Sequence, residues 1–89
     1  MENDGYEKLR GELEKFDYPS IYMFKFIIKD SNQKLALIES LFGEEAQINI
    51  RQSSKGNFVS VTAKEMMMSS EAIINRYKEA AKIEGIMLL

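Results

Sequence analysis

Residues 21–29 are rich in β-branched and aromatic side chains, and both lysines fall on one of the two faces that a period of two defines, which predicts a β-strand. One face of the strand is fully aromatic or aliphatic and carries Tyr22, Phe24, Phe26 and Ile28. The opposite face carries Ile21, Met23, Lys25, Ile27 and Lys29. Because an unpaired charge is costly to bury, the two lysines identify the second face as the one toward water.

Two further alternating segments, residues 47–51 and 58–64, predict a β-hairpin. In its second strand Val59, Val61 and Ala63 are expected to point into the core. The outward positions of that strand are Phe58, Ser60, Thr62 and Lys64. The predicted turn consists of Ser53, Ser54, Lys55, Gly56 and Asn57, in which Gly56 and Asn57 are expected to supply positive φ angles.

Helical periodicity appears in three places. Residues 6–16 present one apolar stripe, made by Leu9, Leu13 and Phe16. A second helix is expected after the start signals at residues 30–32 and is closed by Gly43. A third is expected to start at residues 69–71 and to end at Gly85, followed by a short terminal strand over residues 86–89.

The order of elements is therefore a helix followed by β-α-β-β-α-β. This order predicts an α+β fold, a ferredoxin-like two-layer sandwich with a four-stranded antiparallel sheet and two helices on one face. We expect residues 1–17 to form an N-terminal helical extension and residues 18–89 to form the ferredoxin-like domain. In this architecture the other face of the sheet has no crossover helix over it.

The residue composition excludes several kinds of catalytic and metal-binding site. The chain has no Cys and no His, which excludes thiol nucleophiles, disulfides and imidazole or thiolate metal sites. The acidic pairs at residues 12/14 and 44/45 lie in polar stretches, whereas general acid–base catalysis needs a desolvated carboxyl group. We therefore expect no enzyme activity, no catalytic residue, no metal and no cofactor.

Charge and hydropathy bear on location and partners. The formal net charge of −2 lacks the basic surplus that phosphate binding requires, so we expect no nucleic-acid partner. The first residues contain neither a basic nor an apolar leader segment, and no apolar run approaches 18 residues. These patterns lead us to expect a cytoplasmic protein that does not enter a membrane.

Three segments resemble the YbeD-like family of small uncharacterised bacterial proteins: the turn at residues 53–58, the segment Tyr18-Pro19-Ser20-Ile21-Tyr22-Met23-Phe24-Lys25-Phe26-Ile27, and Lys82-Ile83-Glu84 before a short apolar strand. Together they span residues 18–89. The resemblance implies a ferredoxin-like fold similar to the ACT regulatory domains, which bind small effectors such as amino acids and often dimerise. It implies no settled activity.

The uncovered sheet face is the candidate partner-binding surface, with Ile21, Met23, Lys25, Ile27, Phe58, Ser60 and Thr62. An apolar patch with a polar rim often marks a contact site. The alternative is that the N-terminal helix covers this face with its own apolar stripe, which would move the binding surface to a sheet edge. The turn at residues 53–57 is a second candidate, as an anion cradle, although turn chemistry alone accounts for its residues.

We therefore expect a non-enzymatic regulatory or adaptor domain that binds an unknown protein partner, or forms a homodimer, through the open sheet face or a strand edge. The short apolar segment at residues 86–89 lacks the charges that usually protect an edge. The alternative is an ACT-like domain that binds a small effector. A third hypothesis, an RNA-contacting domain, needs several stacking aromatics, and only Phe58 faces outward.

Overall fold

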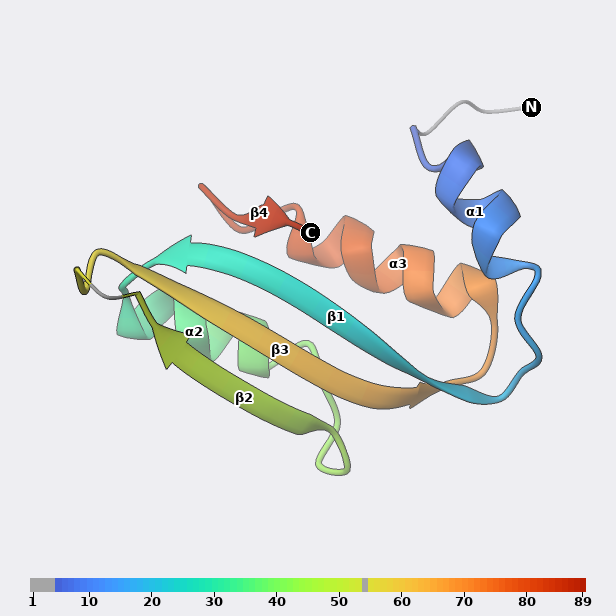
Figure 1. The fold of residues 1–89 in the computed structure, drawn as a ribbon, viewed down its shortest axis with the longest axis horizontal. Coiled ribbons are helices and arrows are strands. Elements are labelled where there is room, and N and C mark those ends of the chain that lie inside the picture. Colours follow the sequence, from blue (N-terminus) through green and yellow to red (C-terminus); the bar gives the residue numbers. More distant parts are fainter. Residues whose placement is uncertain (1–4, 54) are drawn as a thin grey trace.

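The chain folds into three helices and four strands, as a computed structural model that describes residues 5–53 and 55–89 shows (Figure 1). The helices are α1 (Glu7–Leu13), α2 (Asn32–Glu39) and α3 (Ser70–Ala80). The strands are β1 (Ser20–Lys29), β2 (Gln47–Gln52), β3 (Phe58–Met67) and β4 (Met87–Leu88). After α1, this order is the predicted β-α-β-β-α-β.

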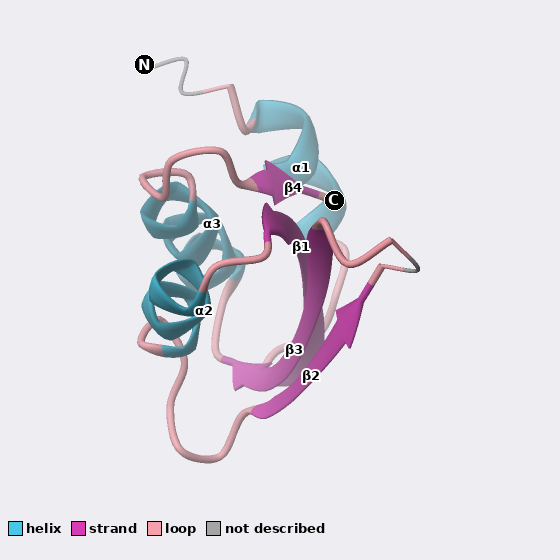
Figure 2. Cartoon of the chain, turned by 90° about the vertical axis from the view of Figure 1, so that its left-hand side faces the viewer, coloured by secondary structure: helices cyan, strands magenta, loops and turns pink. Residues whose placement is uncertain are grey.

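The four strands form one antiparallel sheet in the order β2-β3-β1-β4. The two long central strands pair along their whole lengths, with Phe24 opposite Ala63 and Phe26 opposite Val61. Figure 2 shows α2 and α3 packed on one side of this sheet. The predicted ferredoxin-like α+β arrangement is confirmed, and it places both crossover helices in a single layer.

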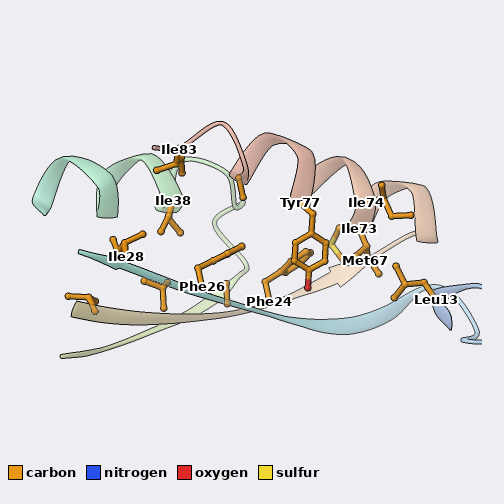
Figure 3. Packing of buried hydrophobic residues seen from close by; sticks show 14 residues of the cluster. Leu13, Phe24, Phe26, Ile28, Ile38, Met67, Ile73, Ile74, Tyr77 and Ile83 are labelled. Carbon is orange, nitrogen blue, oxygen red and sulfur yellow. The ribbon is translucent and has the colours of Figure 1, made fainter. Parts of the chain in front are cut away.

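The core lies between the sheet and this helix layer, and the predicted phase of the strands is correct (Figure 3). Alternate residues of β1 and β3 point toward the helices, where Phe24, Phe26, Val61 and Ala63 are fully buried. Across the core they meet Ile38 of α2 and Ile73, Ile74 and Tyr77 of α3. Because a strand alternates its side chains between faces, Lys25 and Lys29 are consequently exposed on the opposite side.

The predicted helix starts are confirmed, whereas two predicted helix ends are wrong. Ser31 and Ser69 cap α2 and α3 by accepting hydrogen bonds from the amides of Lys34 and Ala72. However, α2 ends at Glu39 rather than just before Gly43, and α3 ends at Ala80 rather than at Gly85. Both helices tighten at their C-terminal ends into turns with i→i+3 hydrogen bonds, which end the α-helix early.

The N-terminal helix lies beside α3 and leaves the outer face of the sheet uncovered (Figure 1). The side chains of Arg10 and Glu71 connect the two helices with an ion pair of 2.5 Å. Leu13 is buried in the common core, and its carbonyl accepts a hydrogen bond of 2.7 Å from the Tyr18 hydroxyl. The predicted apolar stripe fails at Phe16, which is 51% exposed because α1 ends at Leu13.

The predicted alternative in which α1 covers the sheet is therefore wrong. The division of the chain at residues 17 and 18 stays a prediction. In the structure, α1 contributes Leu13 to the same core as the rest of the domain.

Candidate binding face of the sheet

The outward positions of the strands make one continuous surface, which we call the open face. Strand register assigns its members: Ile21, Met23, Lys25, Ile27 and Lys29 of β1, Phe58, Ser60, Thr62, Lys64 and Met66 of β3, Gln47, Asn49 and Arg51 of β2, and Met87 of β4. All seven residues predicted for the binding surface lie on it. Their role in binding stays a prediction.

Apolar side chains occupy part of this open face without cover. Ile21 is 66% exposed, Met23 52% and Phe58 45%. Phe58 and Ile27 also line a small hollow of about 160 Å³ beside Arg51. Single exposed apolar residues are common on protein surfaces, but a group on one sheet face is the pattern of a contact surface.

A larger hollow of about 370 Å³ lies over the centre of the open face. Thr62 of β3 is at its floor, opposite Lys25 on β1 and Asn49 on β2. Lys64 and Arg51 also line this hollow. The hollow therefore combines hydroxyl and amide groups with three cationic side chains.

These cations have no counter-charge on the open face. The described part of the chain contains no ion pair to Lys25, Lys29, Arg51 or Lys64. Every acidic residue that the structure describes lies outside the open-face positions. Those at the margins are Glu45 and Glu65, which line a hollow with Lys64, and Asp30, after β1. The sequence pattern predicts an outward position for Lys64 and places Arg51 around the candidate surface, and strand register brings both to the central hollow.

The turn between β2 and β3 uses its polar groups to hold the hairpin. Gly56 has a φ of +73°, and its amide donates to the Ser53 carbonyl at 2.9 Å. The amide and carbonyl of Phe58 bond to the side chain and amide of Ser53. Asn57 does not have the predicted positive φ, and among the described residues of the turn Gly56 is the one that has it. Lys55 is exposed. Ser54 lies outside the described residues.

The segment after β1 is connected to the same hairpin by hydrogen bonds. The amide of Asp30 donates to the Asn57 carbonyl at 3.1 Å. The carboxylate of Asp30 accepts a hydrogen bond of 2.8 Å from the Gln52 side chain. The polar groups of Asp30 are thus engaged within the chain.

On the helix side, an ion pair that the sequence did not reveal connects three elements. Glu65 of β3 accepts from Arg76 of α3 at 2.5 Å and from the Gly43 amide at 2.8 Å. The guanidinium of Arg76 lies 4.8 Å from the ring centre of Phe42. Gly43 therefore acts through its amide rather than as the predicted helix terminator. The pairing is structural, since both carboxylate oxygens are occupied.

Two tyrosines lie at the centre of the helix side. The hydroxyl groups of Tyr22 and Tyr77 share a hydrogen bond of 2.9 Å. Burial, reinforced by this bond, raises the pKa of Tyr77 above its ordinary value near 10. Burial also raises the pKa of Tyr18, with smaller contributions from Tyr22 and Glu14. Both effects favour the neutral phenol, so these groups serve packing and hydrogen bonding.

The edge of the sheet next to β4 is only partly covered. β4 has two residues and pairs with Phe26 and Ile27, while the Leu89 amide donates to the Lys25 carbonyl at 3.0 Å. In an antiparallel strand, alternate residues direct both backbone groups to the same side. Met23 and Ile21 therefore direct theirs to this edge, beyond the reach of β4. β4 is an edge strand of the sheet, as predicted for residues 86–89, and beyond its two residues the same edge continues on β1.

The described residues also set limits on other kinds of site. No three acidic side chains among them are grouped in a way that could hold a metal ion. The longest helix, α3, has 11 residues, and no described helix has the length and apolar character of a membrane span.

Comparison with known proteins gives a family but no activity. A search of curated proteins and a search of solved structures gave no match. A family model described as "Protein of unknown function (DUF493)" matches residues 13–89. This match includes the whole sheet, both crossover helices and the buried Leu13. The chain belongs to this family, as the resemblance to YbeD-like proteins predicted.

Proposed function

We propose that this protein is a non-catalytic binding domain whose open face docks a partner protein, in an adaptor or regulatory role. The observation that carries the proposal is the open face itself. It combines exposed apolar side chains, free cations and hydroxyl groups on a rigid four-stranded sheet. Protein interfaces likewise combine apolar side chains, which contribute buried area, with polar groups that set orientation.

The long strands give this surface a fixed shape. β1 and β3 pair over ten residues each, and their inner side chains are locked in the core. A partner would therefore meet side chains that are already positioned, which reduces the entropy lost on binding. An RNA ligand is less well supported, because Phe58 is the only aromatic residue among the open-face positions.

The proposal can be tested by capture of partners from a lysate of the native organism, with substitutions matched for exposure. Phe58→Ser and Met23→Ser remove apolar surface from the open face. Leu37→Ser removes a side chain of α2 that is 46% exposed, against 45% for Phe58. We expect the two open-face variants to lose the specific captured protein and the Leu37 variant to retain it.

Circular dichroism and thermal melting of each variant must show that the fold is intact. If Phe58→Ser and Met23→Ser both retain the captured protein at wild-type yield, the open face is not the docking surface. Loss of capture only in Leu37→Ser would move the site to the helix layer.

A second candidate function, self-association, rests on the uncovered edge of β1. The segment Ser20–Phe24 carries no charge, and the backbone groups of Ile21 and Met23 are directed to this edge. Uncharged edges of this kind pair with other strands. Two copies could join their sheets by antiparallel pairing of β1.

Sedimentation equilibrium at micromolar to high-micromolar concentration tests this second candidate. Met23→Pro removes the amide at the edge and keeps the pairing of β1 with β3, which uses the neighbouring residues. We expect wild type to dimerise, Met23→Pro to be monomeric and Met23→Ala to dimerise. A strictly monomeric wild type would contradict self-association without affecting the docking proposal.

A further inference from the structure

We infer that the partner docks on the open face through an acidic protein segment, with carboxylates seated against Lys25, Arg51 and Lys64 and apolar side chains against Met23 and Phe58. This inference rests on the proposed docking function and adds the chemistry of the partner. Its basis is the separation of charge between the open face and the rest of the molecule.

The separation of charge is large for a small domain. Lys25, Lys29, Arg51 and Lys64 give the open-face positions a charge of +4, and no acidic residue shares these positions. The whole chain has a formal charge of −2, so the remainder carries −6. An acidic protein has thus concentrated a third of its cations, 4 of 12, on one uncovered surface.

Strand register brings three of these cations around one point. Lys25 lies directly across from Thr62, and Lys64 lies two residues further along β3 on the same face. Arg51 lies across from Ser60, which is two residues before Thr62. Like charges on neighbouring strands repel one another, and no described carboxylate pairs with them. A bound carboxylate in the central hollow would relieve this repulsion.

The chemistry of the hollow suits carboxylates on a peptide. The guanidinium of Arg51 can hold a carboxylate with two parallel hydrogen bonds, and the lysines act as compact point charges. The hydroxyls of Ser60 and Thr62 and the amide of Asn49 can bind the peptide backbone or further side-chain oxygens. Met23 and Phe58, exposed nearby, would take apolar side chains between the acids.

Charge also favours an acidic protein over other possible ligands of the open face. Two copies stacked by their open faces would oppose four cations with four, so a second copy of this chain does not fit there. A polynucleotide would satisfy the cations, but its bases would find only one aromatic ring, that of Phe58. Aliphatic side chains and Met, which form the rest of the apolar surface, suit protein side chains.

Selection from a random dodecapeptide library displayed on phage tests the inference and does not require the partner to be identified. The targets are wild type, the triple variant Lys25→Gln, Arg51→Gln and Lys64→Gln, and the apolar variants Phe58→Ser and Met23→Ser. We expect peptides enriched on wild type to be acidic and to carry apolar residues. Their affinity should fall at least tenfold on the triple variant, and roughly tenfold between 50 and 300 mM NaCl.

The outcomes distinguish the inference from the docking proposal. Enriched peptides that require Phe58 and Met23 but are not acidic would overturn the acidic partner and keep the docking surface. If nothing is enriched, or if the enriched peptides bind all the variants equally, both are overturned. Oligouridylate serves as a competitor, and tighter binding of oligouridylate than of the best peptide, lost on the triple variant, would replace the acidic partner with RNA.

Discussion

The two faces of one sheet treat positive charge in opposite ways. On the helix side, Arg76 is paired with Glu65 and Arg10 with Glu71. On the open face, Lys25, Arg51 and Lys64 have no ion-pair partner among the described residues. The chain thus pairs the two arginines that connect α3 to α1 and to β3, and leaves the cations of the open face available to a ligand.

This difference indicates which part of the sequence serves stability and which serves contact. Inner positions of β1 and β3 are apolar and fully buried, which is what a small core requires. Outer positions of the same strands contain Ile21, Met23 and Phe58. These side chains are exposed, so they contribute little to the stability of the unbound domain. The outer residues are therefore the ones that a binding role would explain.

The largest expected difference between the faces is in unfolding free energy. Phe24→Ala opens a cavity among Phe26, Phe42 and Tyr77 and should cost about 4 kcal/mol. Ile21→Ala, on the same strand and the opposite face, should cost less than about 1 kcal/mol. Urea denaturation of both variants measures this, and equal losses would contradict the assignment of the faces.

A smaller difference in unfolding free energy should separate Arg76, on the helix side, from Arg51, on the open face. Arg76→Met leaves Glu65 without its ion-pair partner in a mostly buried position and should cost about 2 kcal/mol. Arg51→Met, on the open face, should change stability by less than about 0.5 kcal/mol. If the two substitutions have the same effect in urea denaturation, Arg76 is not the structural connection that its geometry indicates.

High pH should weaken the helix side through Tyr77. Its pKa is raised in the folded state, so the folded protein keeps this proton longer than the unfolded chain does. The stabilisation that Tyr77 gives is therefore complete below pH 10. As the pH rises above 10, the free energy of unfolding falls by up to about 1.4 kcal/mol per pH unit. Tyr77→Phe should flatten this slope in denaturation from pH 9 to 11. An unchanged slope would show that other groups cause it.

The smallest expected effect concerns the cations of the open face. Lys25→Gln and Lys64→Gln remove mutual repulsion and should leave stability unchanged or raise it by a few tenths of a kcal/mol. Lys82→Gln, which breaks a surface pair with Glu79, should lower stability by a similar amount. Thermal melting at low salt measures the stability of all three variants. A clear loss of stability in Lys25→Gln or Lys64→Gln would show that the open-face lysines stabilise the fold.

Sequence pattern was sufficient for the fold because alternation in β1 and β3 determines which side chains face the helices. The lysines at positions 25 and 29 settled the phase, and the structure agrees. The serine caps at positions 31 and 69 were also predictable, since short side chains with an oxygen at helix starts satisfy free amides.

The features that the sequence pattern did not predict depend on contacts between residues that are distant in the sequence. The sequence alone does not show that Glu65 pairs with Arg76, because the two residues lie on different elements. It also does not show that the Gly43 amide donates to the same carboxylate. The cluster of Lys25, Arg51 and Lys64 needs the register of three strands. The Arg10–Glu71 pair, which links α1 to α3, joins residues 61 positions apart, and periodicity cannot reveal such a contact.

Site-specific photocrosslinking in living cells of the native organism tests the docking face most directly. A benzoylphenylalanine at Thr62 would report on the centre of the open face, and the same group at Leu37 on the helix layer. We predict that the Thr62 probe gives one discrete covalent adduct with another protein and that the Leu37 probe gives none. An adduct from Leu37 together with none from Thr62 would contradict a docking role for the open face.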